Sequence, residues 1–304
     1  MSTILVTGAN GFLGRHVSRV AAGLGHYVVG MGHGDWTEET WRDWGLSAWH
    51  ELDVTLASLV GHAGAPDIVV HCAGSSSVGF SMEYPAQDFE RTVSTTLDVL
   101  EYLRTCAPKS ALVYPSSAAV YGRAATLPIA EESPLAPISP YGVHKKITED
   151  LCQSYGRTFG TRVAIVRIFS AYGVELRKQL LWDASLKALA GDFRFAGSGQ
   201  ETRDWVNAED VARLLLIAGD HAAPDAPTVN GASGTEVANR SILEVLFEAL
   251  GAKRNAEFTG TGRSGDPERY AGDPSRAIDW GWAPVRAWDE GVREYARWFR
   301  EIGR

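Results

Sequence analysis

The sequence predicts an α/β fold, a doubly wound parallel sheet followed by a smaller, loop-rich C-terminal region. Three observations support this prediction. Apolar runs of strand length alternate with amphipathic segments of helix length, a glycine-rich turn follows the first apolar run, and the pattern becomes irregular beyond Tyr172. Strands that alternate with helices favour a parallel sheet covered by helices on both faces.

The individual elements follow from this periodicity. Apolar runs typical of strands lie at residues 3–7, 26–31, 67–74, 110–117 and 162–169. Amphipathic segments typical of helices lie at residues 12–24, 84–107, 141–159, 207–220 and 240–251.

Composition and charge exclude several classes of protein. The net charge of -8 argues against a nucleic acid or an anionic membrane as partner. Cys72, Cys106 and Cys152 have neither the spacing of zinc ligands nor that of a disulfide framework. No signal peptide precedes the first strand, and no apolar run reaches the roughly 18 residues that a membrane helix needs. We therefore expect a cytoplasmic protein without a bound metal.

The stretch ILVTGANGFLG predicts a dinucleotide-binding turn, because three glycines follow the first strand at three-residue intervals. Gly8 would permit the tight turn, Gly11 the close approach of a pyrophosphate, and Gly14 the packing of the helix against the strand. The N-terminus of that helix would direct its free N–H groups and its positive dipole end at the phosphates.

This glycine spacing, with Thr7 before it and GFLG at its end, resembles the extended short-chain dehydrogenase/reductase family. The resemblance implies a Rossmann-like fold with bound NAD or NADP. Residues 1–171 are then expected to form the dinucleotide-binding domain, with elements near 205–232 returning to it, and residues 172–304 to form mainly the substrate-binding region. The cofactor-binding residues that the resemblance implies are Gly8, Asn10, Gly11, Phe12, Leu13, Gly14, Gly32, His33, Asp53, Val54, Ala73, Tyr141 and Lys145.

The stretch SPYGVHKK places Tyr141 and Lys145 four residues apart, on one face of the expected helix. A phenol titrates near pH 10, and a fixed ammonium nearby would lower that pKa. Such a tyrosine can exchange a proton with a sugar hydroxyl while hydride moves to or from the adjacent carbon. In YPSSAAVYG, Ser117 matches the catalytic serine of the family and Ser116 is its neighbour. The resemblance therefore implies a triad of Ser117, Tyr141 and Lys145.

Later motifs resemble the nucleotide-sugar epimerase/dehydratase branch of that family. In GSGQETRDWVNAEDVA, Arg203 would reach the nucleotide or its phosphates, and Asp210 would cap or orient the next helix. In GRSGDPERY, Arg263 would pair with the diphosphate, since a planar guanidinium binds phosphate bidentately. The segment LRKQLLWD is expected to form the sugar-nucleotide loop. The implied substrate is a nucleotide-diphosphate sugar, bound by Ser117, Arg177, Gln179, Arg203 and Arg263.

Four positions depart from the family pattern. Ala118 and Ala119 stand where dehydratases of this branch carry an adjacent acidic pair, which argues against 4,6-dehydration. Thr92 replaces the asparagine usual in the long helix. His144 stands where a serine or alanine is common. His144 could relay a proton, but its position three residues after Tyr141 favours packing or solvent contact.

The form of the cofactor stays open at this point. An NAD enzyme usually carries an acid at the end of the second strand, but here Gly32 and His33 occupy that place. No arginine or lysine is present there to hold the phosphate of NADP. Asp53 resembles the acid beside the adenine, and it could equally cap the helix that follows.

These features together predict a nucleotide-sugar 4-epimerase that acts by transient oxidation at carbon 4. One alternative is an NADPH-dependent 4-keto-6-deoxy nucleotide-sugar reductase that uses the same triad. Another is a non-catalytic nucleotide-sensing module, against which the intact serine, tyrosine and lysine argue. The base and the sugar cannot be read from the sequence. The helices at 84–107 and 141–159 resemble the pair that forms the dimer interface in this family, so a homodimer is expected.

Overall fold

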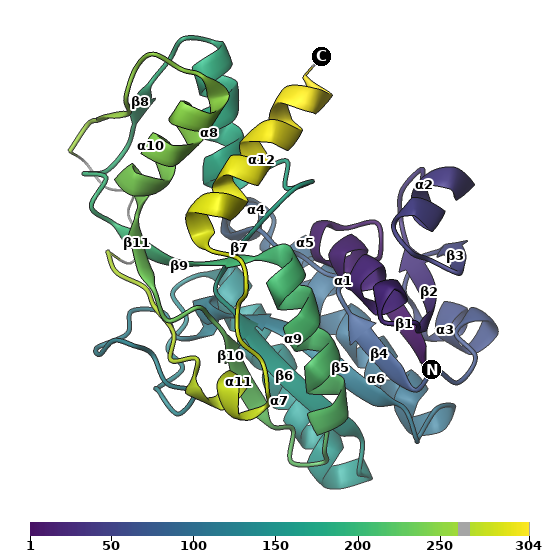
Figure 1. The fold of residues 1–304 in the computed structure, drawn as a ribbon. Helices are drawn as coiled ribbons and strands as arrows, with labels where there is room; N and C mark the ends of the chain where they lie inside the picture. Colours follow the sequence, from purple (N-terminus) through teal and green to yellow (C-terminus); the bar gives the residue numbers. More distant parts are fainter. Residues whose placement is uncertain (261–267, 304) are drawn as a thin grey trace.

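The computed structural model describes residues 1–260 and 268–303. At its centre lies a parallel sheet of seven strands in the order β10-β6-β5-β4-β1-β2-β3 (Figure 1). Its strands are β1 (Thr3–Thr7), β2 (Tyr27–Gly32), β3 (Ala48–Glu51), β4 (Ile68–His71), β5 (Ala111–Ser117), β6 (Arg162–Ile168) and β10 (Thr228–Gly231). The predicted fold class is confirmed, although the sequence pattern missed the short strands β3 and β10.

The strand order changes direction beside β1. The chain runs from β1 through β2 to β3 and then returns to β4 on the other side of β1. In open α/β sheets, ligands bind outside the carboxyl ends of the strands at such a switch point. The loops that follow β1 and β4 meet there, since a Cβ on Gly8 would lie 2.6 Å from the backbone nitrogen of Ala73.

Helices cover both faces of the sheet, which explains why its strands are apolar on both sides. On one face, α1 (Phe12–Gly23) packs beside α9 (Ala208–His221) (Figure 1). On the other face lie α3 (Leu56–His62), α6 (Thr95–Thr105) and α7 (Pro140–Phe159). Each face therefore has its own buried apolar core.

The predicted helix at 84–107 is present, but its turns are not uniform. The chain forms α4 (Val78–Glu83), α5 (Pro85–Phe89), a π-helical turn η1 (Glu90–Ser94) and then α6. Proline is tolerated in a first helical turn, and Pro85 begins α5 in this way. A π-helical turn inside a helix is often found at a functional site.

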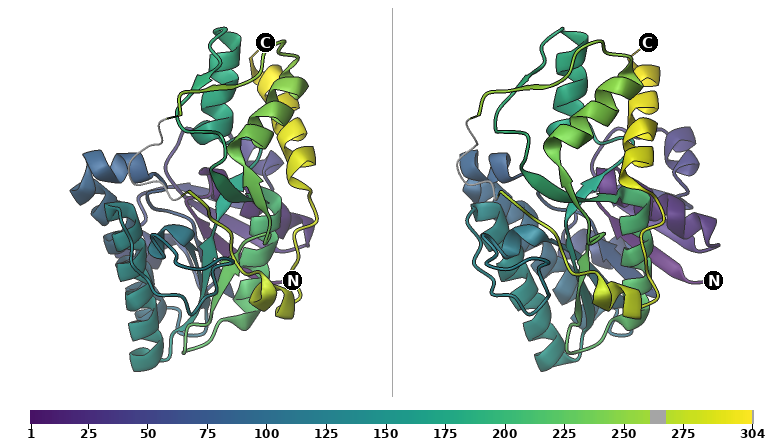
Figure 2. Two further views of the ribbon diagram at one scale, coloured as in Figure 1. Left: turned by 90° about the vertical axis from the view of Figure 1, so that its left-hand side faces the viewer. Right: turned by 60° about the vertical axis from the view of Figure 1, so that its left-hand side comes forward.

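The C-terminal region is more regular than its sequence pattern predicts. Helices α8 (Gln179–Leu189), α10 (Asn239–Leu250) and α12 (Trp288–Ile302) lie together, apart from the main sheet (Figures 1 and 2). A three-stranded sheet joins the two parts of the molecule and consists of β7 (Ser170–Tyr172), β9 (Thr202–Asn207) and β11 (Glu236–Ala238). The remaining short elements are α2 (Glu38–Asp43), η2 (Ala118–Val120), β8 (Arg194–Phe195), β12 (Glu257–Phe258) and α11 (Ser275–Asp279).

The expectation of a loop at LRKQLLWD is wrong from Gln179 onward, because α8 begins there. Leu181 and Ala184 of this helix are buried in the core of the C-terminal region. Burial of these side chains stabilises a helix that the short apolar run alone did not indicate.

Candidate active site

The glycine-rich turn lies at the carboxyl end of β1, at the switch point of the sheet. Gly8 has a φ of 66°, a backbone conformation that L side chains rarely adopt. Its N–H donates to the carbonyl of Met31 (2.7 Å), and its carbonyl accepts from the N–H of Gly11 (2.9 Å). A Cβ on Gly14 would overlap the Gly8 carbonyl oxygen. The glycines of this turn therefore expose backbone atoms without side chains at the N-terminus of α1.

The first turn of α1 fits an anion. Gly11 is the N-cap residue, no side chain caps this helix, and its first turn has no acidic residue. The N–H groups at such a terminus can bind phosphate, which the helix dipole favours. Phe12 and Leu13 begin the helix and are partly buried: Leu13 packs against the core between α1 and the main sheet, and Phe12 packs against the core of the C-terminal region. The residues present therefore fit the pyrophosphate of a dinucleotide.

At the end of β2, the predicted adenosine site has an unusual composition. A Cβ on Gly32 would lie 3.3 Å from the backbone of Gly8, so the glycine keeps this corner open. The Nε2 atom of His33 lies 2.7 Å from Oδ1 of Asp53, and these side chains are 79% and 73% exposed. Thr55 caps α3, so the alternative in which Asp53 is the N-cap is wrong. The exposed His33–Asp53 pair therefore stands where an NAD enzyme usually has one acid.

The other predicted cofactor residues lie around this surface. The side-chain amide of Asn10 donates to the backbone carbonyl of His33 (3.3 Å), which ties the loop after β2 to the glycine turn. The N–H of Ala73 donates to the hydroxyl of Thr7 (3.3 Å). Val54 is buried in the core beneath them.

Arg15 also belongs to this region, and the sequence analysis missed it. Its guanidinium donates to the backbone and side-chain oxygens of Asn10 (2.7 and 2.9 Å) and pairs with Glu175 (2.9 Å). The guanidinium also lies 5.5 and 5.1 Å from the rings of Trp36 and Trp44. Arg15 thus links the glycine turn to the segment that leads into α8. An arginine directly after the third glycine is a local signal, but its partner Glu175 is 160 residues away.

Ser117, Tyr141 and Lys145 come together at the carboxyl end of β5. Ser117 is the last residue of that strand, and its hydroxyl accepts from the N–H of Ala119 (3.2 Å). Tyr141 lies in the first turn of α7. Lys145 is 8% exposed, donates from Nζ to the carbonyl of Pro115 (2.8 Å), and lies 6.0 Å from the centre of the Tyr141 ring. One hydroxyl, one phenol and one ammonium therefore share a small volume beside the switch point.

The titration behaviour of this group differs in part from the sequence-based expectation. Burial raises the pKa of Tyr141, the neighbouring Ser117 hydroxyl acts in the opposite direction, and the charge of Asp88 raises it further. Burial lowers the pKa of Lys145 to about 8. The sequence predicted that Lys145 would lower the pKa of Tyr141, but in the protein alone desolvation dominates and this pKa is raised.

A buried ion pair lies next to the residues that precede Ser117 and follow Lys145. The guanidinium of Arg167 pairs with the carboxylate of Glu149 (2.8 Å), and both side chains are almost fully buried. The hydroxyl of Ser116 donates to the same carboxylate (2.5 Å). The Ser116 hydroxyl is therefore bound to the ion pair, whereas the Ser117 hydroxyl does not take part in it and belongs to the candidate site. Glu149 lies one helical turn after Lys145 on α7, so this network fixes β5 against the helix that carries Tyr141.

The residues predicted to bind substrate are spread over the C-terminal region. Arg203 lies on β9, and its guanidinium donates to the carbonyl of Thr202 (2.7 Å). Arg177 is exposed, pairs with Glu175 (3.4 Å) and lies over the ring of Trp298. Gln179 begins α8 and is exposed. Arg263 lies outside the described residues.

Asp210 does not cap α9, contrary to one sequence-based expectation. Asn207 is the N-cap residue, and its side chain accepts from the N–H of Glu209 (2.9 Å). The buried carboxylate of Asp210 accepts instead from the N–H groups of Val285 and Arg286 (both 3.2 Å). Asp210 therefore anchors the segment before α12 to the first turn of α9.

Lys178 is a further cation that the sequence analysis missed. Its Nζ donates to the hydroxyl of Ser76 (2.5 Å), which lies in the loop after β4. Partial burial lowers the pKa of this ammonium. The contact connects the start of α8 to the edge of the sheet where Tyr141 and Ser117 lie. Lys178 stands in the LRKQ motif between Arg177 and Gln179, the two residues that the resemblance implies for substrate binding.

His144 packs as expected and has one further contact. It packs against the ring of Phe89, but its Nδ1 atom also lies 2.6 Å from a carboxylate oxygen of Asp88, which is fully buried. Thr92, the other unusual position in this part, accepts from the N–H of Ser75 through its hydroxyl (3.3 Å).

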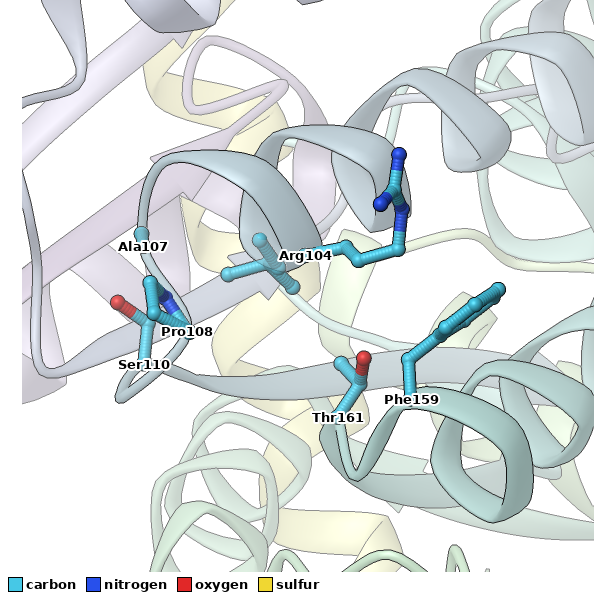
Figure 3. A pocket seen from close by; sticks show the side chains of 7 residues that line it. Arg104, Ala107, Pro108, Ser110, Phe159 and Thr161 are labelled. Carbon is cyan, nitrogen blue, oxygen red and sulfur yellow. The ribbon is translucent and has the colours of Figure 1, made fainter.

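A small surface pocket lies elsewhere on the molecule. Figure 3 shows it between the end of α6 and the end of α7. Ser110, which precedes β5, and Phe159, which ends α7, line it. Ser117 and Tyr141 lie at the opposite ends of these two elements, so the pocket is separate from the candidate site.

Among the described residues, no group of three or more His, Cys, Asp or Glu side chains could hold a metal ion. The same part of the chain contains no helix with the length and apolar character for crossing a membrane.

Comparison with known proteins assigns the chain to a family. Residues 4–230 match the model of the NAD dependent epimerase/dehydratase family. A putative UDP-glucose 4-epimerase of Methanocaldococcus jannaschii is 28% identical over 245 residues, which cover 78% of each chain. A GDP-6-deoxy-D-mannose reductase of Pseudomonas aeruginosa is 27% identical over 96% of this chain and 98% of its own.

A solved structure supports the same assignment. The UDP-glucose 4-epimerase from Brucella ovis in complex with NAD is 26% identical, covers 98% of both chains and superimposes with a TM-score of 0.86. The family resemblance and the nicotinamide cofactor predicted from the sequence are thereby confirmed. The chain is therefore an enzyme that belongs to the NAD-dependent epimerase/dehydratase family.

Proposed function

We propose that this enzyme is a nucleotide-sugar 4-epimerase, which inverts the configuration at carbon 4 by transient oxidation. The observation that carries this proposal is the convergence of Ser117, Tyr141 and Lys145 at the carboxyl end of β5, on the same edge of the parallel sheet as the uncapped N-terminus of α1. A dinucleotide whose pyrophosphate binds at that helix would extend along this edge, which supports Tyr141 as its proton acceptor.

In this proposal, Gly8, Gly11 and Gly14 hold the dinucleotide at the switch point. When bound, the oxidised dinucleotide supplies a hydride acceptor and a positive charge beside the phenol. Tyr141 takes the proton of the sugar hydroxyl at carbon 4 and later returns it to the same oxygen. That charge, together with Lys145, opposes the effect of burial on the pKa of Tyr141.

Ser117 orients the reacting oxygen through its hydroxyl, which can both donate and accept a hydrogen bond. Buried Lys145 is fixed by the Pro115 carbonyl and keeps its ammonium at one place beside Tyr141. Arg203, Arg263 and the lysine at the start of α8, Lys178, are the cations proposed to bind the diphosphate. Ala118 and Ala119 offer no acidic group to expel water, so dehydration is not part of the proposal.

The names of the relatives favour epimerisation, with UDP-glucose as the first substrate to test. One relative is named a GDP-6-deoxy-D-mannose reductase, and a reductase could use the same triad. The absence of an acid at Gly32 fits NAD and NADP equally on charge alone. The reductase is therefore the second candidate.

Cofactor retention and product stereochemistry together distinguish the two. An epimerase ends each cycle with its cofactor oxidised again, so we expect protein purified without added cofactor to release dinucleotide on denaturation. With UDP-glucose and other nucleotide hexoses, the product should be the 4-epimer with no net formation of reduced nicotinamide. Protein that purifies empty and consumes NADPH stoichiometrically with a 4-keto-6-deoxy nucleotide sugar would replace this proposal with the reductase.

A further inference from the structure

A buried acid and a histidine join two helices beside the candidate site. Asp88 of α5 is fully buried, and His144 of α7 is 11% exposed. The Nδ1 atom of His144 lies 2.6 Å from Oδ2 of Asp88. A carboxylate only accepts hydrogen bonds, so Nδ1 carries the proton of this contact. The pair connects the segment before the π-helical turn to the first turn of α7, three residues after Tyr141.

The carboxylate of Asp88 is not fully satisfied by this contact. Its other oxygen, Oδ1, is buried and has no hydrogen-bond partner in the described part of the chain. A buried charge is unfavourable unless paired groups compensate it. The hydrogen bond from His144 is therefore the main compensation that Asp88 receives.

The charge of Asp88 acts on the site. It raises the pKa of Tyr141, and it also favours the charged form of Lys145. Removal of the His144 hydrogen bond would leave this charge less compensated beside the phenol. Removal of the carboxylate would take the charge away altogether.

Other polar and titratable groups around Tyr141 and Lys145 come from the elements packed against α7. From β5, the Ser117 hydroxyl acts on Tyr141 in the direction opposite to Asp88. Cys72 after β4, together with Glu149 and Cys152 on α7, acts on Lys145.

Two neighbouring contacts complete the environment. From α4, the Ser81 hydroxyl accepts from the backbone N–H of Tyr141 (3.0 Å). From the π-helical turn, the guanidinium of Arg91 lies over the ring of Phe80 instead. Among the described residues, Asp88 is the acid whose charge raises the pKa of Tyr141.

We infer that Asp88 and His144 form a positioning pair for Tyr141, in which the imidazole restrains the charge that Asp88 places beside the phenol. This inference rests on the proposed function, in which Tyr141 exchanges the proton. Neither member touches the reacting atoms, and each acts through Tyr141. The pair couples two positions 56 residues apart, one of which, position 144, commonly carries a small residue in this family.

The test compares Asp88→Asn, His144→Ala and His144→Asn as NAD-saturated holoenzymes. The first readout is the acidic limb of kcat against pH, which reports the base in the complex. The second readout needs no substrate and is the ultraviolet absorbance of tyrosinate against pH, measured as the difference between each protein and its Tyr141→Phe counterpart. Asp150→Asn is the matched control, because Asp150 forms an exposed ion pair with Lys146 on the same helix (2.8 Å).

Opposite displacements are expected from the two main variants. Asp88→Asn removes a negative charge, so both readouts should move to lower pH, by roughly one unit, the lower end of the effect of a neighbouring charge. His144→Ala should move both readouts to higher pH. His144→Asn restores an N–H donor near the position of Nδ1 and should return them toward the wild type. The control should leave them unchanged.

A pair with only a structural role would lower kcat and thermal stability without moving either readout. Unmoved readouts, or displacements in the same direction in Asp88→Asn and His144→Ala, would therefore overturn the inference. If His144→Ala does not fold, the isosteric Asp88→Asn variant and the rescue variant decide the matter. Opposite displacements of the tyrosinate absorbance in a protein that epimerises no sugar would refute the proposed function and leave this inference standing.

Discussion

Gly14 of α1 packs directly against the carbonyl oxygen of Gly8, with no room for a Cβ between them. Gly14→Ala should therefore displace the turn, destabilise the protein by roughly 1–3 kcal/mol and weaken dinucleotide binding. Gly23 provides the matched control, since it lies in the same helix and a Cβ there would meet nothing within 4 Å. Gly23→Ala should stabilise the protein by roughly 0.5–1 kcal/mol. Chemical denaturation and calorimetric titration with NAD measure both effects, and equal behaviour of the two variants would contradict the prediction.

Substitution of Tyr141 tests the proposed base. Tyr141→Phe removes the hydroxyl and keeps the ring, so dinucleotide binding should persist while turnover falls by about 100-fold or more. Steady-state kinetics with a nucleotide hexose and fluorescence titration with NADH give the two quantities. A variant that retains more than about a tenth of the wild-type rate would exclude Tyr141 as the base.

The proposed phosphate contacts are tested at Arg203 and Arg263. Each arginine-to-alanine change should weaken nucleotide-sugar binding by roughly 1.5–3 kcal/mol, the range of hydrogen bonds to charged groups. Dinucleotide affinity should stay unchanged, because these residues belong to the substrate side of the proposed site. Calorimetry with UDP and with UDP-glucose checks this. Unchanged affinity for both ligands in both variants would remove the two arginines from the site.

Two buried histidines should make folding stability depend on pH. Burial lowers the pKa of His71 to about 3 and that of His16 to about 4, whereas the ordinary value is 6.5. Between these values the unfolded chain binds protons that the folded protein does not bind, so the free energy of unfolding falls as pH falls below 6.5. At about pH 5 the loss should be roughly 2 kcal/mol for each histidine.

Denaturation curves between neutral pH and about pH 5 measure this slope. His71 accepts or donates hydrogen bonds with the hydroxyls of Thr7 (2.7 Å) and Thr96 (3.1 Å), so His71→Asn should be less stable at neutral pH. The variant should nevertheless lose less stability on acidification. A slope equal to that of the wild type would show that His71 does not contribute.

A homodimer remains our prediction for the state in solution. Apolar side chains are exposed on the two helices concerned: Leu97 of α6 is 40% exposed, and Val143 and Phe159 of α7 are 40% and 54% exposed. Light scattering should give twice the mass of one chain, and Leu97→Glu should shift the equilibrium toward the monomer. Leu24→Glu is the control, because Leu24 is 64% exposed at the end of α1. A monomer mass for the wild type at micromolar concentration would contradict the prediction.

The sequence predicted those features that depend on local spacing. Tyr141 and Lys145 lie on one helix, so their separation of four residues was enough to place them on one face. The glycine turn at residues 8–14 could be interpreted for the same reason, since strand, turn and helix are contiguous. The family match confirms the class of enzyme and the class of cofactor.

Features that depend on distant partners could not be predicted in this way. The contacts of Arg15 with Glu175 and of Asp88 with His144 join segments 160 and 56 residues apart. His144 stood out in the sequence, but nothing in its neighbourhood pointed to Asp88 as its partner. The resemblance implied that Asp210 would cap or orient the next helix, but Asn207 is the N-cap residue and Asp210 binds the segment before α12. The helix at Gln179 was missed because its stability comes from burial against other elements of the C-terminal region.

The position of β10, the last strand of the seven-stranded sheet, has a consequence for folding during synthesis. This strand pairs with β6 through residues 228–231, long after the other six strands have left the ribosome. Until then β6 is an open edge with unpaired backbone groups, and such edges promote aggregation. A fragment that ends at residue 171 would keep this edge permanently. A recombinant fragment intended to contain the complete seven-stranded sheet should therefore extend to residue 231.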